Sequence, residues 1–254
     1  MTAPLALVTG GVRRVGAAIS GKLAQAGYDL ALHGHSDAEP EDELLETLKL
    51  ASTEWHGFVA NFEDTGSAST LIAAVTNHFG RAPDVLVNSA SIFGQDSLSN
   101  LDADMLEKHM SVNMMLPVLL TIELANTRKS ADRGCVVHIL DQRVRNPNHD
   151  QLSYTLSKQA LSESVRTLAL TCAKTMRVNG VAPGLTLTAG EYGEEQLKNI
   201  TAMMPLDQLP SPDDIADAVL YLVQAAVVTG QTICVDGGAN LKSFDRDFVH
   251  LGKN

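Results

Sequence analysis

Thr9-Gly10-Gly11-Val12-Arg13-Arg14-Val15-Gly16 joins an apolar run, Leu5–Thr9, to a helical pattern, Val15–Ala26. Glycines permit a tight turn between a strand and a helix, and the free N–H groups at a helix N-terminus attract phosphate. A strand, such a turn and a helix are typical of the first unit of a dinucleotide-binding sheet. We therefore expect a dinucleotide pyrophosphate to lie against this turn; the alternative is a plain structural turn.

Short apolar runs alternate with helical patterns along the rest of the chain. Strands are expected at Leu5–Thr9, Asp29–His33, Gly57–Ala60, Asp84–Asn88, Cys135–Leu140, Arg177–Val181 and Thr232–Val235. Helices are expected at Val15–Ala26, Glu41–Ala51, Thr65–Phe79, Asp102–Asn126, Tyr154–Thr175 and Pro212–Gln224. Short strands separated by helices indicate βαβ units with right-handed crossovers. We predict one α/β domain over residues 1–254, doubly wound and Rossmann-like, with a parallel sheet of about seven strands and helices on both faces.

The segment 186–209 follows a predicted strand and shows no clear periodicity. Loops after the carboxyl ends of parallel strands often carry substrate contacts. We expect a substrate loop there.

The composition excludes several kinds of partner. The 254 residues carry a formal net charge of −11, which argues against nucleic acid because phosphate backbones need a basic surface. The apolar start at Ala3–Val8 is too short to cross a membrane and has no basic leader. Cys135, Cys172 and Cys234 are widely spaced and match no zinc motif. Reduced thiols are expected, and with them a cytoplasmic protein that holds no metal.

Tyr154 and Lys158 stand one helical turn apart, so both side chains are expected on the same helix face. A lysine ammonium beside a phenol favours the phenolate and lowers a pKa that starts near ~10. Such a phenol can donate a proton to a substrate atom next to one that receives a hydride. Asp141 follows the predicted strand Cys135–Leu140. If Asp141 is buried beside Tyr154, burial would favour its protonated form and let it relay a proton; alternatively, it caps a helix or a loop.

The end of the second predicted strand indicates which dinucleotide binds. An NAD site has Asp or Glu there for the ribose 2′-hydroxyl. This chain instead reads Leu32-His33-Gly34-His35-Ser36, with no carboxylate before Asp37. Arg13, His33, His35 and Ser36 suit a 2′-phosphate, which a carboxylate would repel. NADPH is the predicted cofactor, although the two histidines could also be loop residues without a ligand.

On these motifs the chain resembles the short-chain dehydrogenase/reductase family over essentially its whole length. Further motifs are Asn88-Ser89-Ala90-Ser91, Asn113, Pro183-Gly184 and Asp236-Gly237-Gly238. The resemblance implies a catalytic set of Asp141, Tyr154, Lys158 and Asn113, with Asn113 supporting the proton relay. It implies cofactor contacts from Gly10, Arg13, Arg14, Val15, Gly16, His33, His35, Ser36, Asn61, Asn88, Ser89, Ala90, Tyr154, Lys158, Pro183 and Gly184. Asn61 stands where most of the family has Asp beside the adenine, so this chain departs from the family at the adenine contact.

Three departures are similar to the pteridine reductases and the bacterial dihydromonapterin reductases. Arg14 replaces a glycine of the turn, Asp141 replaces a catalytic serine, and Ser91-Ile92-Phe93 follows the fourth strand. The narrower resemblance implies substrate contacts from Arg14, Ser91, Phe93, Asp141, Tyr154 and Leu185. Two alternatives stay open: Phe93 as a core or lid aromatic, and Arg14 as a ligand of the phosphates alone.

The leading hypothesis is an NADPH-dependent reductase that transfers hydride to a dihydropterin of the dihydromonapterin, dihydrobiopterin or dihydrofolate type. A carboxylate at Asp141 would repel a ketone-derived oxyanion but would suit ring N–H groups. The runner-up is a carbonyl reductase of the same family, such as a 3-oxoacyl reductase. A non-catalytic NADP(H)-binding regulator is the third hypothesis. The intact Tyr154–Lys158 pair argues against it, because a sensor needs no proton donor. By analogy with the family we expect a homotetramer whose partner is a small pterin or related heterocycle.

Overall fold

The computed structural model describes residues 2–129, 132–187 and 192–253. Its seven strands form one sheet in the order β3-β2-β1-β4-β5-β6-β7, and every neighbouring pair is parallel. The strands are β1 (Leu5–Thr9), β2 (Asp29–Gly34), β3 (Trp55–Val59), β4 (Val85–Asn88), β5 (Gly134–Ile139), β6 (Met176–Pro183) and β7 (Thr232–Val235). The predicted doubly wound α/β fold is confirmed.

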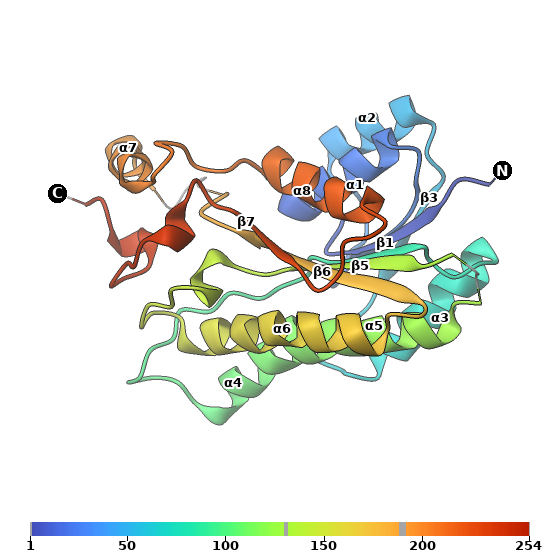
Figure 1. Cartoon of the computed structure of the whole chain (residues 1–254), viewed down its shortest axis with the longest axis horizontal. Coiled ribbons are helices and arrows are strands. Elements are labelled where there is room, and N and C mark those ends of the chain that lie inside the picture. The colour runs from blue at the N-terminus through green and yellow to red at the C-terminus, as the bar shows by residue number, and fades with distance from the viewer. Residues whose placement is uncertain (1, 130–131, 188–191, 254) are drawn as a thin grey trace.

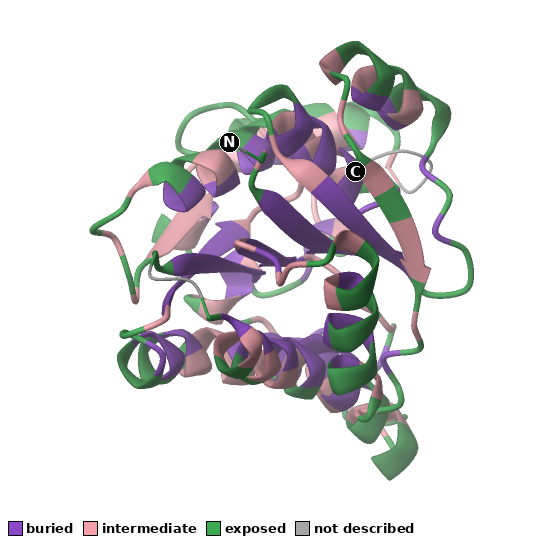
Figure 2. Ribbon diagram, turned by 90° about the vertical axis from the view of Figure 1, so that its right-hand side faces the viewer, coloured by how far each residue is buried: buried purple, intermediate pink, exposed green. Residues whose placement is uncertain are grey.

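Helices cover both faces of this sheet (Figure 1). On one face lie α1 (Arg14–Gln25), α2 (Asp42–Ala51) and α8 (Pro212–Gln224); on the other lie α3 (Ser67–Phe79), α4 (Ala103–Met110), α5 (Leu116–Thr127) and α6 (Leu152–Thr171). Successive side chains of a strand point to opposite faces of the sheet, so they pack alternately in the two layers of the core. Val8 packs in the α1 and α8 layer, whereas its neighbour Leu7 packs in the α3 and α5 layer. Figure 2 shows the central strands buried between helices whose outer faces are exposed, while the edge strands β3 and β7 are not fully buried.

The predicted helix Asp102–Asn126 is not continuous. A π-helical segment, Ser111–Met115, separates α4 from α5, and Asn113 lies in its middle. Single π turns in helices often mark functional sites. The helix predicted at Tyr154–Thr175 begins two residues earlier, at Leu152, and ends at Thr171.

The segment 186–209 contains a helix that its sequence did not suggest, α7 (Glu194–Met203). Residues 188–191 of the expected substrate loop lie outside the described residues. Helix α7 buries Ile200 in a small separate core with Met204, Ala239 and Phe248, and it therefore packs on the C-terminal part of the chain. No helix in the described part of the chain is both long and apolar enough to span a membrane.

Candidate active site

A cavity of about 690 Å³ opens along the carboxyl ends of the strands, beside the β1–β4 pair where the strand order reverses. Ligands of doubly wound sheets bind at this switch point. We call the part lined by the Gly10–Gly16 turn and His35 the cofactor end. We call the part lined by Phe93, Asp141, Arg143 and Asp247 the substrate end. The predicted site residues that line the cavity are Gly10, Arg13, Arg14, Val15, Gly16, His33, His35, Ser36, Ser89, Ala90, Ser91, Phe93, Asp141, Tyr154, Lys158, Pro183, Gly184 and Leu185.

Close backbone packing forms the turn at the cofactor end. Gly10 has φ 61°, and a Cβ on Gly16 would overlap the carbonyl oxygen of Gly10. Glycine is needed at both positions, and the N-terminus of α1 is left open to the cavity. This open cradle fits a dinucleotide pyrophosphate. Arg14, which occupies a usual glycine position, keeps the left-handed backbone at φ 57°. A non-glycine residue in this region is strained and indicates a role for its side chain.

His33 is buried at the cofactor end, in contact with the Gly10–Gly16 turn. Its Nδ1 accepts from the Gly10 N–H (3.2 Å) and its Nε2 donates to the Ala60 carbonyl (3.0 Å). The ring is stacked on Phe62 at 4.0 Å, and burial lowers the pKa of His33 to about 4. Both ring nitrogens thus have partners within the protein, so the groups exposed toward a 2′-phosphate are Arg13, His35 and Ser36. Asp37 also lines this corner.

Three of the expected site residues do not line the cavity. Asn61 is exposed and its Oδ1 accepts from Glu63 N. Asn88 is buried beneath the site, where its Nδ2 lies 3.1 Å from His138 Nδ1. These two side chains therefore do not face the cavity, in contrast to the direct cofactor contacts expected from the resemblance.

Asn113 links the loop after β4 to α6. Its Oδ1 accepts from Ser91 Oγ (3.1 Å) and Ile92 N (2.9 Å), and its Nδ2 donates to Ile92 O and Ser157 Oγ, both at 3.0 Å. Ser157 Oγ in turn donates to the Tyr154 carbonyl. The side chain of Asn113 therefore holds the wall of the site instead of touching the proposed proton donor.

The two members of the predicted catalytic pair have different partners. Tyr154 Oη donates to Asp141 Oδ2 at 2.9 Å, while Lys158 Nζ donates to the Ile139 carbonyl at 2.8 Å. Burial and the neighbouring Asp141 charge raise the pKa of Tyr154 well above its ordinary 10. The lowering expected from Lys158 is wrong, because its ammonium is turned toward Ile139 and lies 5.8 Å from the phenol ring centroid. The phenol is thus held in its protonated, proton-donating form.

Burial lowers the pKa of Lys158 itself to about 8. A cation is costly in a dry environment, and the nearby Asp141 offsets only part of that cost. The lysine charge is therefore sensitive to pH just above neutrality.

Asp141 does cap a turn, as one alternative held, because its Oδ1 accepts from Arg143 N at 2.8 Å. The capping leaves Oδ2 for Tyr154, so one carboxylate serves both purposes. Phe93 is half exposed, lines the cavity and meets the Tyr154 ring edge-on at 4.8 Å. It belongs to the wall of the site and not to the core.

Sequence reasoning missed much of the substrate end. Arg143 is buried, lies 5.2 Å from the Tyr154 ring centroid, and donates from Nε to Asp141 Oδ1 at 3.3 Å. A cation two residues after Asp141 was a usable signal. Gln142, directly after Asp141, also lines this end. The other missed residues come from distant segments, and no local pattern identifies them: Gln95, Tyr192, Asp247, Phe248 and Val249.

Comparisons with known proteins agree with this geometry. The family model described as enoyl-(acyl carrier protein) reductase matches residues 11–240. A 3α-hydroxysteroid dehydrogenase from Mediterraneibacter gnavus is 32% identical, with 92% of this chain and 96% of that protein covered. Pteridine reductase 1 from Leishmania tarentolae is 30% identical, with 94% and 97% covered.

Among solved structures, FolM alternative dihydrofolate reductase 1 from Brucella canis, complexed with NADP, superposes with a TM-score of 0.84 at 32% identity. The match covers 94% of this chain and 95% of that one. The family model spans most of the sequence, and the cavity brings together the Gly-rich turn, Tyr154 and Lys158. The chain therefore belongs to the short-chain dehydrogenase/reductase family of oxidoreductases.

Proposed function

We propose that this protein is an NADPH-dependent reductase of dihydropterins, of the dihydromonapterin, dihydrobiopterin or dihydrofolate type. The observation that carries the proposal is the hydrogen bond from Tyr154 Oη to Asp141 Oδ2 at 2.9 Å. A carboxylate replaces the neutral hydroxyl that would hold an oxyanion during ketone reduction. Its lone pairs suit the ring N–H groups of a pterin. The similarity to a pteridine reductase and to FolM, whose structure contains NADP, supports the same substrate class and cofactor.

NADPH, when bound, supplies the hydride that reduces the C=N bond of the ring. The Gly10–Gly16 turn would hold its pyrophosphate, and Arg13 with His35 and Ser36 would receive the 2′-phosphate. Phe93, which is half exposed, offers a flat surface to a planar heterocycle at the substrate end.

Tyr154 delivers the proton to the ring nitrogen beside the carbon that gains the hydride. The phenolate left on Tyr154 would be repelled by Asp141, so nearby positive charge is required. The Arg143 guanidinium, whose carbon lies 5.2 Å from the centroid of the phenol ring, supplies most of it, and the Lys158 ammonium at 5.8 Å adds to it. Asp141 orients the hydroxyl and accepts from the ring N–H groups.

The test measures NADPH oxidation with a dihydropterin, with an acetoacetyl thioester and without substrate. Wild type should turn over the dihydropterin fastest. Asp141→Asn should lower that rate by about 10²- to 10⁴-fold, because the amide keeps the shape but carries no charge and cannot exchange a proton. Asp141→Ser should cost pterin activity and favour the thioester. Unchanged dihydropterin turnover in Asp141→Asn would eliminate the proposed role.

A carbonyl reductase remains the second candidate, and the similarity to the hydroxysteroid dehydrogenase is the observation that favours it. Faster reduction of the thioester than of any pterin by wild type would establish it instead. A protein that bound NADPH but reduced neither substrate would be the non-catalytic regulator.

We also propose a cytoplasmic homotetramer. Three apolar side chains, each about 40% exposed, lie on neighbouring elements: Met115 on the π-helical segment, Ile122 on α5 and Leu156 on α6. Apolar side chains gathered on neighbouring helices favour contact with a second copy. Sedimentation velocity measures the assembly, and a monomer would contradict the proposal.

A further inference from the structure

The two carboxylate oxygens of Asp141 have separate partners. Oδ2 accepts from Tyr154 Oη, whereas Oδ1 accepts from Arg143 N at 2.8 Å and from Arg143 Nε at 3.3 Å. A carboxylate held by two donors on one oxygen cannot rotate without losing both bonds. The Arg143 backbone N–H and side chain therefore act together to orient the carboxylate, and the side chain contributes to where Oδ2 lies relative to the phenol.

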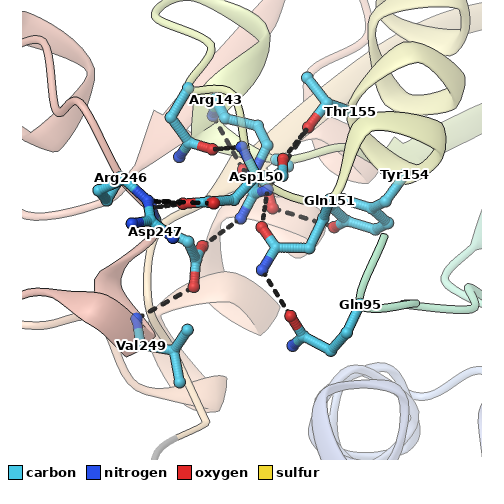
Figure 3. A network of polar contacts seen from close by, with 11 residues as sticks. Gln95, Arg143, Asp150, Gln151, Tyr154, Thr155, Arg246, Asp247 and Val249 are labelled. Carbon is cyan, nitrogen blue, oxygen red and sulfur yellow. Dashed lines mark hydrogen bonds and ion pairs between the residues drawn. The ribbon is translucent and has the colours of Figure 1, made fainter. Parts of the chain in front are cut away.

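The far side of the Arg143 guanidinium is held by residues outside the proposed proton relay. One terminal nitrogen donates to Gln151 Oε1 at 2.9 Å, and the other donates to Asp247 Oδ2 at 2.5 Å (Figure 3). The Arg143 side chain is only 5% exposed and that of Asp247 only 9%. A charge-assisted bond in such a dry setting is strong and directional.

Asp247 is itself fixed in the C-terminal segment. Its Oδ1 caps the short helix η4 (Phe248–His250) by accepting from Val249 N, and its own N–H donates to Asp150 Oδ2 at 2.8 Å. Arg246 Nε also bonds to Asp150, at 2.9 Å. From α7, Gln196 Nε2 donates to the carbonyls of Val249 and Leu251. The C-terminal segment is thus fastened to the start of α6, directly before Tyr154.

We propose that Asp247 is a positioning residue for the reduction: it holds Arg143 so that Asp141 presents Oδ2 to Tyr154. The C-terminal segment Arg246–Val249 would then be part of the catalytic machinery although it is more than ninety residues from Tyr154 along the chain. This inference rests on the proton-relay part of the proposed function and does not depend on which substrate is reduced.

The first experiment compares Asp247→Ala, Asp247→Asn and the matched control Asp245→Ala. Asp245 is an exposed aspartate of the same segment, two residues away. Asp247→Ala should lower kcat by about 10²-fold, since small misplacements of reacting groups can cost that much. Its KM for NADPH should stay near the wild-type value, because Asp247 lies at the substrate end. Asp247→Asn should retain more activity than Asp247→Ala, because its amide oxygen still accepts from Arg143.

The second experiment is a double-mutant cycle with Arg143→Ala. If Asp247 acts through Arg143, the double variant should be no slower than Arg143→Ala alone, since non-additivity reports a shared pathway. Additive losses in kcat would overturn the proposal, as would an Asp247→Ala enzyme as fast as Asp245→Ala. If Asp247→Ala does not fold, as judged by thermal unfolding, the cycle is run with Asp247→Asn.

All rates are measured with the dihydropterin and with the thioester. A wild type that reduces only the thioester would defeat the dihydropterin proposal while leaving the Asp247 comparison decisive on that substrate. Normal dihydropterin turnover with no kcat effect of Asp247→Ala would defeat the positioning role alone.

Discussion

At the cofactor end of the cavity the wall is largely backbone from one continuous turn, in which Gly10 and Gly16 pack against each other. At the substrate end the wall is a set of buried side chains, in which Arg143 bonds to Asp141 and also to Asp247, which lies 104 residues after Arg143 in the sequence. A backbone cradle follows from local sequence, because glycine spacing determines it. A side-chain network follows from how the whole chain is folded. The two ends should therefore respond differently to mutation.

The largest expected effect separates catalysis from cofactor binding. Tyr154→Phe removes only the proton donor, so kcat should fall by about 10²- to 10⁴-fold. The Gly10–Gly16 turn is untouched, and NADPH binding followed by fluorescence should remain close to wild type. A phenylalanine variant with most of its activity would mean that another group donates the proton.

Gly16→Ala should break the cofactor end alone. The added Cβ would overlap the Gly10 carbonyl, and relieving such a clash typically costs about 1–3 kcal/mol and occasionally more. We expect NADPH affinity to collapse and thermal stability to fall. Gly193→Ala is the matched control, because a Cβ there meets nothing within 4 Å. Equal NADPH affinities in the two variants would show that the turn tolerates a side chain.

How much of the site the sequence could predict follows the same division. The strand, turn and helix periods identified the fold and the cofactor end, and helical spacing placed Tyr154 beside Lys158. The role of Asp247 could not be predicted, because its partner Arg143 is reached only through tertiary packing. Asn88 was expected to contact the cofactor and Asn113 to act in the proton relay, but both side chains lie behind the cavity wall, because local sequence does not tell a lining residue from one behind it. Helix α7 was missed because it buries only Gln196 and Ile200, the latter in a small outlying core, so its sequence carries little apolar periodicity.

The pH dependence should distinguish the two ends. His33 has a folded pKa of about 4 against an ordinary 6.5, so its contribution to stability is complete above 6.5 and is lost as pH falls toward 4. Full protonation would cost about 3 kcal/mol. Lys158, with a pKa of about 8, loses its charge as pH rises through that value, and kcat should fall there.

The free energy of unfolding measured against pH checks the effect of His33, and kcat measured against pH checks the effect of Lys158. His33→Gln should weaken the acid dependence of stability, whereas the exposed His149→Gln should leave it as in wild type. His138, buried with a pKa of about 3, adds to the acid limb in both variants. An acid dependence that His33→Gln does not change would contradict the assignment.

A smaller effect concerns the choice of cofactor. Arg13 is exposed at the corner with His35 and Ser36, and a charge-assisted phosphate contact is worth about 1.5–3 kcal/mol. Arg13→Ala should therefore raise the KM for NADPH by about 10- to 100-fold and change that for NADH little. Steady-state kinetics with both cofactors measures the ratio. Equal losses for the two would mean that Arg13 contacts the pyrophosphate instead.

The smallest effect tests whether the one strained residue of the turn serves the substrate end. Arg14 holds φ 57°, a conformation that costs a residue with a side chain about 1–2 kcal/mol. Replacement by glycine relieves this strain, but the greater freedom of glycine in the unfolded chain offsets about 0.5–1 kcal/mol of the relief. Arg14→Gly should thus be more stable than wild type by up to about 1 kcal/mol. Arg13→Gly is the control, because Arg13 is extended at φ −150° and has no strain to release. If Arg14 reaches the substrate, the stabilised Arg14→Gly enzyme should reduce dihydropterin more slowly. Undiminished turnover would leave Arg14 as a ligand of the phosphates alone and confine its role to the cofactor end.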